Sequence, residues 1–373
     1  MMVVHMNMVT RVTLGKLNHH YLGWVEDAQG FVFISGLVVG LVYGGMMIRK
    51  SADRMVKALR ARMVTIYTYH AFLIIGFATL ALALNAIGYN ASVLQPYTEH
   101  PMIFSLLSLG LVTGSMHMGI LPMYLWFMLA TPLVLRAFHA GHAPTVLVVS
   151  LGLWLFAQTG LVDYWVHAIE SDTGMPLGIF FNIFGWQVIF FSGLWFGYLL
   201  AADRLDLGVL RHPSIKVAAV PVLLLVLLLA VYDRIVFDDL VSHDFSMTAL
   251  LLSDRGNFTP IYLLSFFLDL FLIAWLIVAG RDCGIRIVER LSALVSWIFT
   301  RPALIFLGQH SLQVFAWHLV MVYLADILLE GHRVGEVAGS LILIAGVASL
   351  YIPAAIHARP ELISAMTFPR RRT

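Results

Sequence analysis

Two basic residues beside an apolar stretch have the types and spacing of a phosphate-binding pair. Lys57 and Arg60 are three residues apart, so they are neighbours on one face of a helix. Two cations at the mouth of a membrane protein can bind phosphate groups by charge and by the forked geometry of Arg. His70, two to three helical turns further on, would line the same passage. On charge alone, the segment 49–62 is also typical of a basic loop that sets membrane orientation.

Ionisable residues inside apolar stretches are costly and therefore need a partner or a function. Asp269 lies in the middle of such a stretch, and Asp326 lies near the end of another. His318 precedes Asp326 by eight residues, and His310 precedes His318 by eight. Eight residues turn a helix by about 800°, so these side chains drift by about 80° per step and do not form one stripe. The spacing therefore argues against a proton relay, and His318 is either a packed polar bridge or a functional residue.

Metal and nucleophile motifs are weak or absent. His19 and His20 are adjacent, and His139 and His142 are three apart, but neither pair is accompanied by the Cys, second His pair or acid that a zinc site requires. The sequence contains no Gly-x-Ser-x-Gly elbow, no Walker loop and no dinucleotide fingerprint. With one cysteine, Cys283, no intramolecular disulfide can form. We expect no bound metal.

The composition requires a bilayer around these residues. The 373 residues are 60% hydrophobic and 12% charged, against about 45–50% and about 25% in soluble domains, and the mean hydropathy is +0.87. A water-soluble globule is excluded, and the basic residues form no continuous face for nucleic acid. We therefore expect an all-α, polytopic membrane helix bundle in a single domain covering residues 1–373.

The expected architecture is about ten transmembrane helices. A crossing of about 30 Å needs about 20 apolar residues. The segment 1–10 is too short for this, and we expect it to be the remnant of a first helix that begins upstream. Residues 357–373 would be a cytoplasmic tail. Nine stretches meet or approach the required length: 31–48, 63–87, 118–135, 145–160, 181–200, 217–231, 260–280, 303–329 and 337–356.

Charge predicts the orientation of these spans. If the loops alternate sides and 49–62 is cytoplasmic, most of the 23 basic residues fall inside, including Arg370–Arg372. The outer segments carry most of the acids, among them Asp163, Glu170, Asp172, Asp238, Asp239 and Asp244. We therefore expect an integral membrane protein with both termini of the complete protein in the cytoplasm.

Four segments resemble the OpgC family of the membrane acyltransferase-3 superfamily. Residues 24–43 resemble the family's second helix, and the other three segments resemble its Leu-Pro-x-Tyr, Phe-Asn-x-x-x-Trp-Gln and Leu-Gly-x-x-Ser-Leu-x-Val-Phe-x-x-His motifs. These three are Ile120-Leu-Pro-Met-Tyr124, Phe181-Asn-Ile-Phe-Gly-Trp-Gln187 and Leu307-Gly-Gln-His-Ser-Leu-Gln-Val-Phe-Ala-Trp-His318. The matches occur in order from about residue 1 to 330. The family takes its name from proteins that succinylate osmoregulated periplasmic glucans.

The resemblance implies acyl transfer across the membrane. An acyl-CoA would enter from the cytoplasm, and a hydroxyl of an extracytoplasmic glucan or other glycan would receive a succinyl or similar group. His5 resembles the family's first-helix histidine and would be the general base. Ser35 and nearby amides would stabilise charge on the thioester carbonyl, although Ser35-Gly36 is equally typical of a helix contact. His318 joins the candidate catalytic residues, and Lys57 and Arg60, with His70, would hold the CoA.

The sequence departs from the family pattern at four places. The basic residue expected ten positions before His5 falls upstream of Met1, which supports the expectation that the gene product begins earlier. Gly119 and Gln29 stand where an acid is usual, and Tyr262 stands where an Arg is usual.

Two rival functions stay open. Ten spans with Asp269 and Asp326 suit a proton-coupled exporter of a sugar or polysaccharide, but no inverted repeat is evident. The chain is also compatible with a non-catalytic partner of the glucan synthesis machinery. Release of CoA by the purified protein would separate these functions from acyl transfer.

Overall fold

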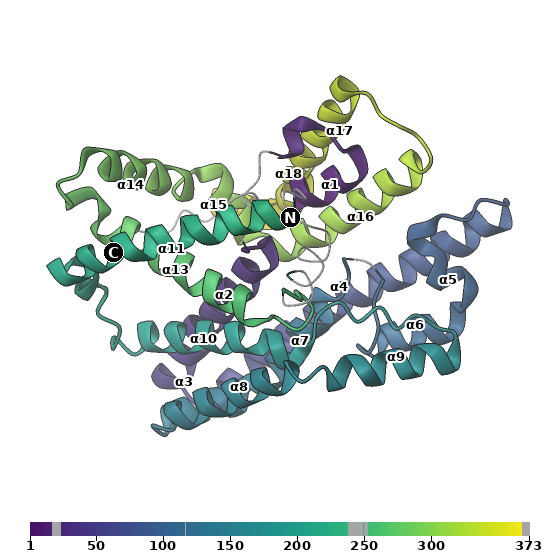
Figure 1. The fold of residues 1–373 in the computed structure, drawn as a ribbon. Coiled ribbons are helices and arrows are strands. Elements are labelled where there is room, and N and C mark those ends of the chain that lie inside the picture. The colour runs from purple at the N-terminus through teal and green to yellow at the C-terminus, as the bar shows by residue number, and fades with distance from the viewer. Residues whose placement is uncertain (17–23, 116, 238–248, 250–252, 368–373) are drawn as a thin grey trace. The chain divides into compact units, whose positions relative to one another are not determined.

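The computed structural model describes residues 1–16, 24–115, 117–237, 249 and 253–367 (Figure 1). These residues form helices and turns and contain no strand. Among the described residues, eight helices are long and apolar enough to cross a membrane, or ten if each of two bent helix pairs is one span. The expected all-α polytopic membrane fold is confirmed. His19, His20, Asp238, Asp239, Asp244 and Arg370–Arg372 lie outside the described residues.

Contacts divide the chain into two compact units, of which the first consists of residues 1–18, 91–93 and 280–373. A single domain over the whole chain stays a prediction. The expected tail at 357–373 begins inside a helix that continues to Thr367. The α-helices of the first unit are α1 (Met2–Thr10), α14 (Arg286–Phe299), α15 (Pro302–Gln309), α16 (Ser311–Leu329), α17 (Glu336–Ser349) and α18 (Tyr351–Thr367).

The second unit consists of residues 19–90 and 94–279. A π-helical segment at Gly40–Gly44 joins its first two α-helices. The α-helices are α2 (Asp27–Val39), α3 (Gly45–Arg49), α4 (Ala52–Ala86), α5 (Gln95–Glu99), α6 (Pro101–Leu109), α7 (Ile120–His139), α8 (Ala143–Ala157), α9 (Leu161–Thr173), α10 (Ile183–Ala201), α11 (Pro213–Phe237) and α13 (Pro260–Ala279).

Close helix packing in the second unit depends on glycines. Helices α2 and α10 pack along their length, and a Cβ added at Gly36 would lie 2.2 Å from the carbonyl oxygen of Phe190. No side chain fits there, so the two backbones approach as closely as small residues allow. The glycines at this contact are Gly36, Gly40, Gly193 and Gly197.

One stretch expected as a single span is broken. The stretch 303–329 is interrupted at His310, which follows α15 and precedes α16. Apolar composition continues across this break, so hydropathy alone does not reveal it. The expected span 145–160 ends at a second break, where α8 and α9 are bent by 46° and Gly160 has a φ of 68° that glycine adopts without steric cost.

Candidate functional site

The short helix α1 is held in a groove of the first unit by α16 and α17. The side chains of Met2 and Met6 are buried in a cluster with Val322 of α16 and Leu343 of α17. A Cβ at Gly346 of α17 would come within 2.9 Å of the Met2 Cε atom, so Gly346 lies directly against the Met2 side chain. The buried methionines of α1 therefore define the face that meets α16 and α17, and the three helices are drawn together in Figure 1.

That packing brings two predicted catalytic residues together. The Nδ1 atom of His5 and the Nε2 atom of His318 are 2.9 Å apart, which is a hydrogen bond in which one ring N–H donates to the other ring. The ring centroids are 4.9 Å apart. His5 is half-buried and His318 is buried, with the Phe315 ring against it. The pair joins residues 313 positions apart and can move a proton at an oriented imidazole.

A second histidine pair lies further toward the start of α16. The Nδ1 atoms of His310 and His357 are 2.9 Å apart, and the Phe306 ring lies edge-on to His310. His310 is buried, while His357 of α18 is exposed. His357 was not among the residues predicted from sequence, and only its histidine side chain could have suggested it. Within the described residues, no three His, Cys, Asp or Glu side chains form a metal-binding group.

Ser35 belongs to the second unit, on α2. It is half-buried, and its neighbour Gly36 meets the backbone of α10. The small-residue contact considered for this pair is therefore present at Gly36. A role for Ser35 in stabilising a thioester stays a prediction.

The predicted donor-binding residues share α4 but not one location. Lys57 and Arg60 are exposed on its early turns, beyond Ser51, whose Oγ accepts the Arg54 N–H and caps the helix. His70 is fully buried, roughly 15 Å along the axis from Arg60, and its Nε2 atom bonds the carbonyl oxygen of Ser108 at 2.9 Å. The structure therefore separates His70 from the two cations and gives it a contact with α6.

The segment 181–187, which resembles Phe-Asn-x-x-x-Trp-Gln, forms hydrogen bonds that join the start of α10 to α8 and to residues 255–257. The Asn182 side chain caps α10 at the Phe184 N–H and donates to the Oδ1 atom of Asn257. The Trp186 ring N–H donates to the carbonyl oxygens of 255 and 256. Gln187 exchanges two hydrogen bonds with Ser150 of α8. This motif therefore positions the segment before α13.

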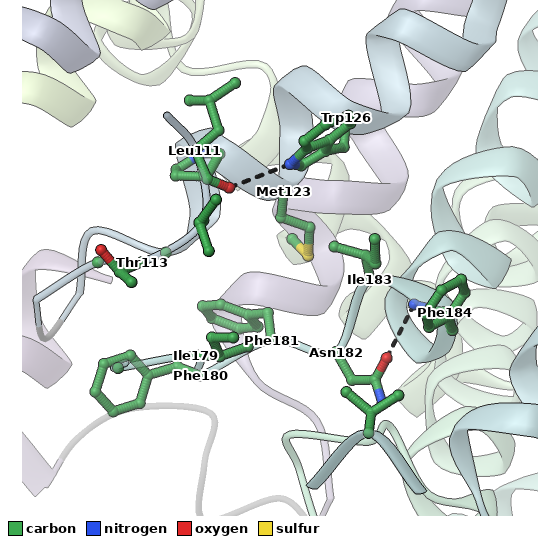
Figure 2. Close-up of a pocket in the computed structure, with 16 residues that line it drawn as sticks. Leu111, Thr113, Met123, Trp126, Ile179, Phe180, Phe181, Asn182, Ile183 and Phe184 are labelled. Atoms are coloured by element: carbon green, nitrogen blue, oxygen red, sulfur yellow. Dashed lines mark hydrogen bonds between the residues drawn. The ribbon is translucent and has the colours of Figure 1, made fainter. Parts of the chain in front are cut away.

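The same motif lines an apolar cavity of about 200 Å³ with the first turn of α7 (Figure 2). Pro122, Met123 and Phe181 form part of its wall. Its polar side chains are engaged within the protein: Asn182 as above, Trp126 with the Leu111 carbonyl oxygen, and Thr113 with Ser108. The cavity can hold an apolar group, and its side chains include no candidate nucleophile or base.

His117 is a half-buried histidine that the sequence analysis did not single out. It lies in the loop before α7 and has a φ of 67°. Burial, and secondarily the positive charge of Arg255, lower the pKa of His117 to about 4. Arg255 itself forms an ion pair with Glu26 at 3.1 Å. His117 is therefore neutral at physiological pH.

The helices define a polytopic all-α membrane protein in which one unit carries an oriented histidine pair. The chain belongs to the OpgC family, because the family model described as OpgC protein matches residues 1–361. The resemblance seen in four segments thus extends over nearly the whole chain. Membership suggests a glucan-modifying, acyltransferase-like role. No curated protein and no solved structure matches the chain.

Proposed function

We propose that this protein is an integral-membrane O-acyltransferase that transfers a succinyl or similar acyl group from cytoplasmic acyl-CoA to a hydroxyl of an extracytoplasmic glucan or related glycan. The observation that carries the proposal is the His5–His318 hydrogen bond in a chain of the OpgC family. Bacterial inner-membrane localisation and a place beside the glucan synthesis machinery follow as parts of the same proposal.

In the proposed reaction, His5 is the general base. We assign the shared proton to the Nδ1 atom of His5, which donates to Nε2 of His318 and leaves Nε2 of His5 as the proton acceptor. The acceptor hydroxyl gives its proton to this nitrogen while its oxygen attacks the thioester carbonyl. The new C–O bond forms, the C–S bond breaks, and the imidazolium returns the proton to the CoA thiolate.

His318 acts in this scheme as a positioning residue. Its ring is buried and packed by Phe315, so the nitrogen that faces His5 is held in place. A fixed acceptor for the Nδ1 proton selects one tautomer of His5 and stabilises the imidazolium that forms during transfer. This is the role that an orienting group has beside a catalytic histidine.

Lys57 and Arg60 supply donor binding in the proposal. Both are exposed, so they can reach CoA phosphates in the aqueous phase. Ser35 and adjacent amides are proposed to stabilise the thioester oxyanion.

Replacing both Lys57 and Arg60 by Gln should weaken acyl-CoA binding without changing the orientation of the protein in the membrane, because Arg49, Lys50 and Arg54 remain. A matched Arg49→Gln, Arg54→Gln variant is the control, and equal CoA affinity in both variants would remove Lys57 and Arg60 from the site.

The function is tested with the purified full chain in proteoliposomes. Acyl-CoA is supplied on one side and glucan on the other, and free thiol and acylated glucan are measured together. We expect CoA release that depends on glucan and equals the ester formed. Glucan movement without CoA release would identify a transporter, and neither activity would favour the assembly partner.

A further inference from the structure

Helix α14 has a one-sided apolar pattern that differs from the spans. Its residues Ile287, Leu291, Leu294 and Ile298 fall within roughly 60° of one another around the helix axis. We name these four residues the α14 stripe. The opposite side carries Glu289, Ser292 and Ser296. A helix that crosses the bilayer is apolar all round, whereas a one-sided pattern is typical of a helix lying at an interface.

The α14 stripe is exposed and the opposite side is not. The four residues of the stripe expose between 40% and 76% of their surface, whereas Ser292 is fully buried. Exposed aliphatic side chains in such a row need an apolar environment. The face around Ser292 already packs on protein, so the stripe is left for another partner.

Cations border the α14 stripe. Arg286 and Arg290 are exposed and lie roughly 70–110° around the helix from the centre of the stripe. At the end of the helix, the guanidinium carbon of Arg301 lies 4.2 Å from the centre of the Trp297 ring, and its Nε–H donates to the Trp297 carbonyl oxygen. Tryptophan and arginine together are typical of the boundary between hydrocarbon and lipid headgroups.

We propose that α14 lies in the plane of the membrane on its cytoplasmic surface and binds anionic lipids. The α14 stripe enters the acyl-chain region, and Arg286 and Arg290 contact lipid phosphates. The charges favour this partner, because anionic lipid headgroups complement a cationic flank beside an apolar face. The proposal concerns a surface outside the histidine pair and stands independently of the acyltransferase function.

An interfacial α14 can be distinguished from a membrane-spanning α14 by the environment of its successive residues. α14 and α15 together are apolar enough to pass as one broken span with a 47° bend. In a span, the environment of successive residues would change gradually along the helix. In an interfacial helix, it alternates with the helical repeat.

The test uses single-cysteine variants of the full chain. Cys283, the only native cysteine, is replaced by Ser, and one cysteine is placed at 287, 291, 294 or 298, or on the cationic side at 286, 290 or 293. In vesicles of phosphatidylcholine with phosphatidylglycerol, a thiol-linked fluorophore is quenched by brominated lipids, and a membrane-impermeant maleimide measures access from water. We expect lipid quenching at the four stripe positions and maleimide labelling at the other three.

Lipid selectivity supplies the second measurement. Quenching by brominated phosphatidylglycerol should exceed that by brominated phosphatidylcholine, and Arg286→Gln with Arg290→Gln should remove this preference. A basic residue near an anionic surface contributes about 1 kcal/mol, a factor of about five for each Arg removed. Leu224→Cys, on the exposed face of α11, is the control for a lipid-facing span.

Three outcomes would overturn the proposal. A gradual change in labelling from 286 to 298 would place α14 in a span. Stripe positions protected from both lipid and maleimide would mean that protein covers them. Equal quenching by both lipids, unchanged in the arginine variant, would remove the anionic partner.

Discussion

Two imidazole pairs, one on α16 and one at the residue just before it, share one hydrogen-bond distance and differ in their surroundings. His5–His318 and His310–His357 each have ring nitrogens 2.9 Å apart. In the first pair, the partner comes from α1, a helix anchored in an apolar cluster. In the second pair, the partner is an exposed side chain on α18.

The difference shows that the surroundings, rather than the residue type, decide what a histidine pair can do. Water can replace an exposed partner at little cost, so such a bond orients a ring weakly. His5 is half-buried, and the apolar cluster that holds α1 keeps its ring beside His318. The bond at His5 also uses Nδ1 against Nε2 of His318, whereas the other pair is joined through both Nδ1 atoms. We therefore assign proton transfer to His5–His318.

The largest effect is expected from His5→Ala. Loss of a positioned base typically lowers a rate by about 10²–10⁴, while expression and CoA binding should persist because His5 is only half-buried. The measurement is acyl transfer per folded molecule. The wild-type rate should also rise with pH as imidazole loses its proton. Acyl transfer at near wild-type rate by His5→Ala would show that another residue is the general base and that the His5–His318 pair is not the catalytic pair.

His318 should give the next effect. His318→Ala removes the acceptor of the His5 proton, so the rate should fall, but by less than the about 10²–10⁴ expected when the base itself is lost. A buried cavity and an unpaired polar group should also lower the free energy of unfolding by about 1–3 kcal/mol.

The conservative variant separates position from packing. His318→Gln keeps a polar atom near the former Nε2 and should recover part of the rate and shift the pH profile less than His318→Ala. If His318→Ala lowers only thermal stability, with rate per folded molecule and pH profile unchanged, His318 is a packing residue.

The fold could be predicted further from sequence than the site. Apolar stretches predicted the spans because burial in lipid depends on composition. They did not predict the break at His310, because helix ends depend on backbone angles that apolar residues do not signal. His5 and His318 were both candidates, but their contact depends on the packing of α1 against α16 and α17, which no local pattern contains. His357 was missed because its contact with His310 also joins helices that are far apart in the sequence.

Departures from the family pattern became interpretable only in three dimensions. Gln29 and Tyr262 stand where an acid and an Arg are usual, and both contact Trp24. The Gln29 amide donates to the Trp24 carbonyl oxygen, and the Tyr262 ring lies edge-on to the Trp24 ring. The two departures thus lie in one neighbourhood around Trp24.

His117 can be compared with the two histidine pairs, because desolvation keeps its imidazole neutral. The pKa of His117 is about 4 in the folded protein and about 6.5 in an unfolded chain. Only the unfolded chain takes up this proton between these values, so stability is lost as pH falls from about 6.5 to about 4 and is level below. We expect a slope of up to about 1 kcal/mol per pH unit in thermal unfolding. His117→Asn, which tolerates the positive φ, should remove it. An unchanged slope would assign the pH dependence elsewhere.

The smallest effect is expected from His357→Ala, and it decides whether the two pairs differ in role. His357 is exposed, so water can replace it at the Nδ1 atom of His310, and the net loss should be about 0.5–1.5 kcal/mol of unfolding free energy. The rate per folded molecule and its pH profile should match the wild type. The measurement sets His357→Ala beside His5→Ala in the same assay, because each removes one partner of an imidazole pair. A rate loss in His357→Ala comparable to that in His5→Ala would place both pairs in the transfer reaction. The different exposure of the two pairs would then no longer explain which of them takes part in catalysis.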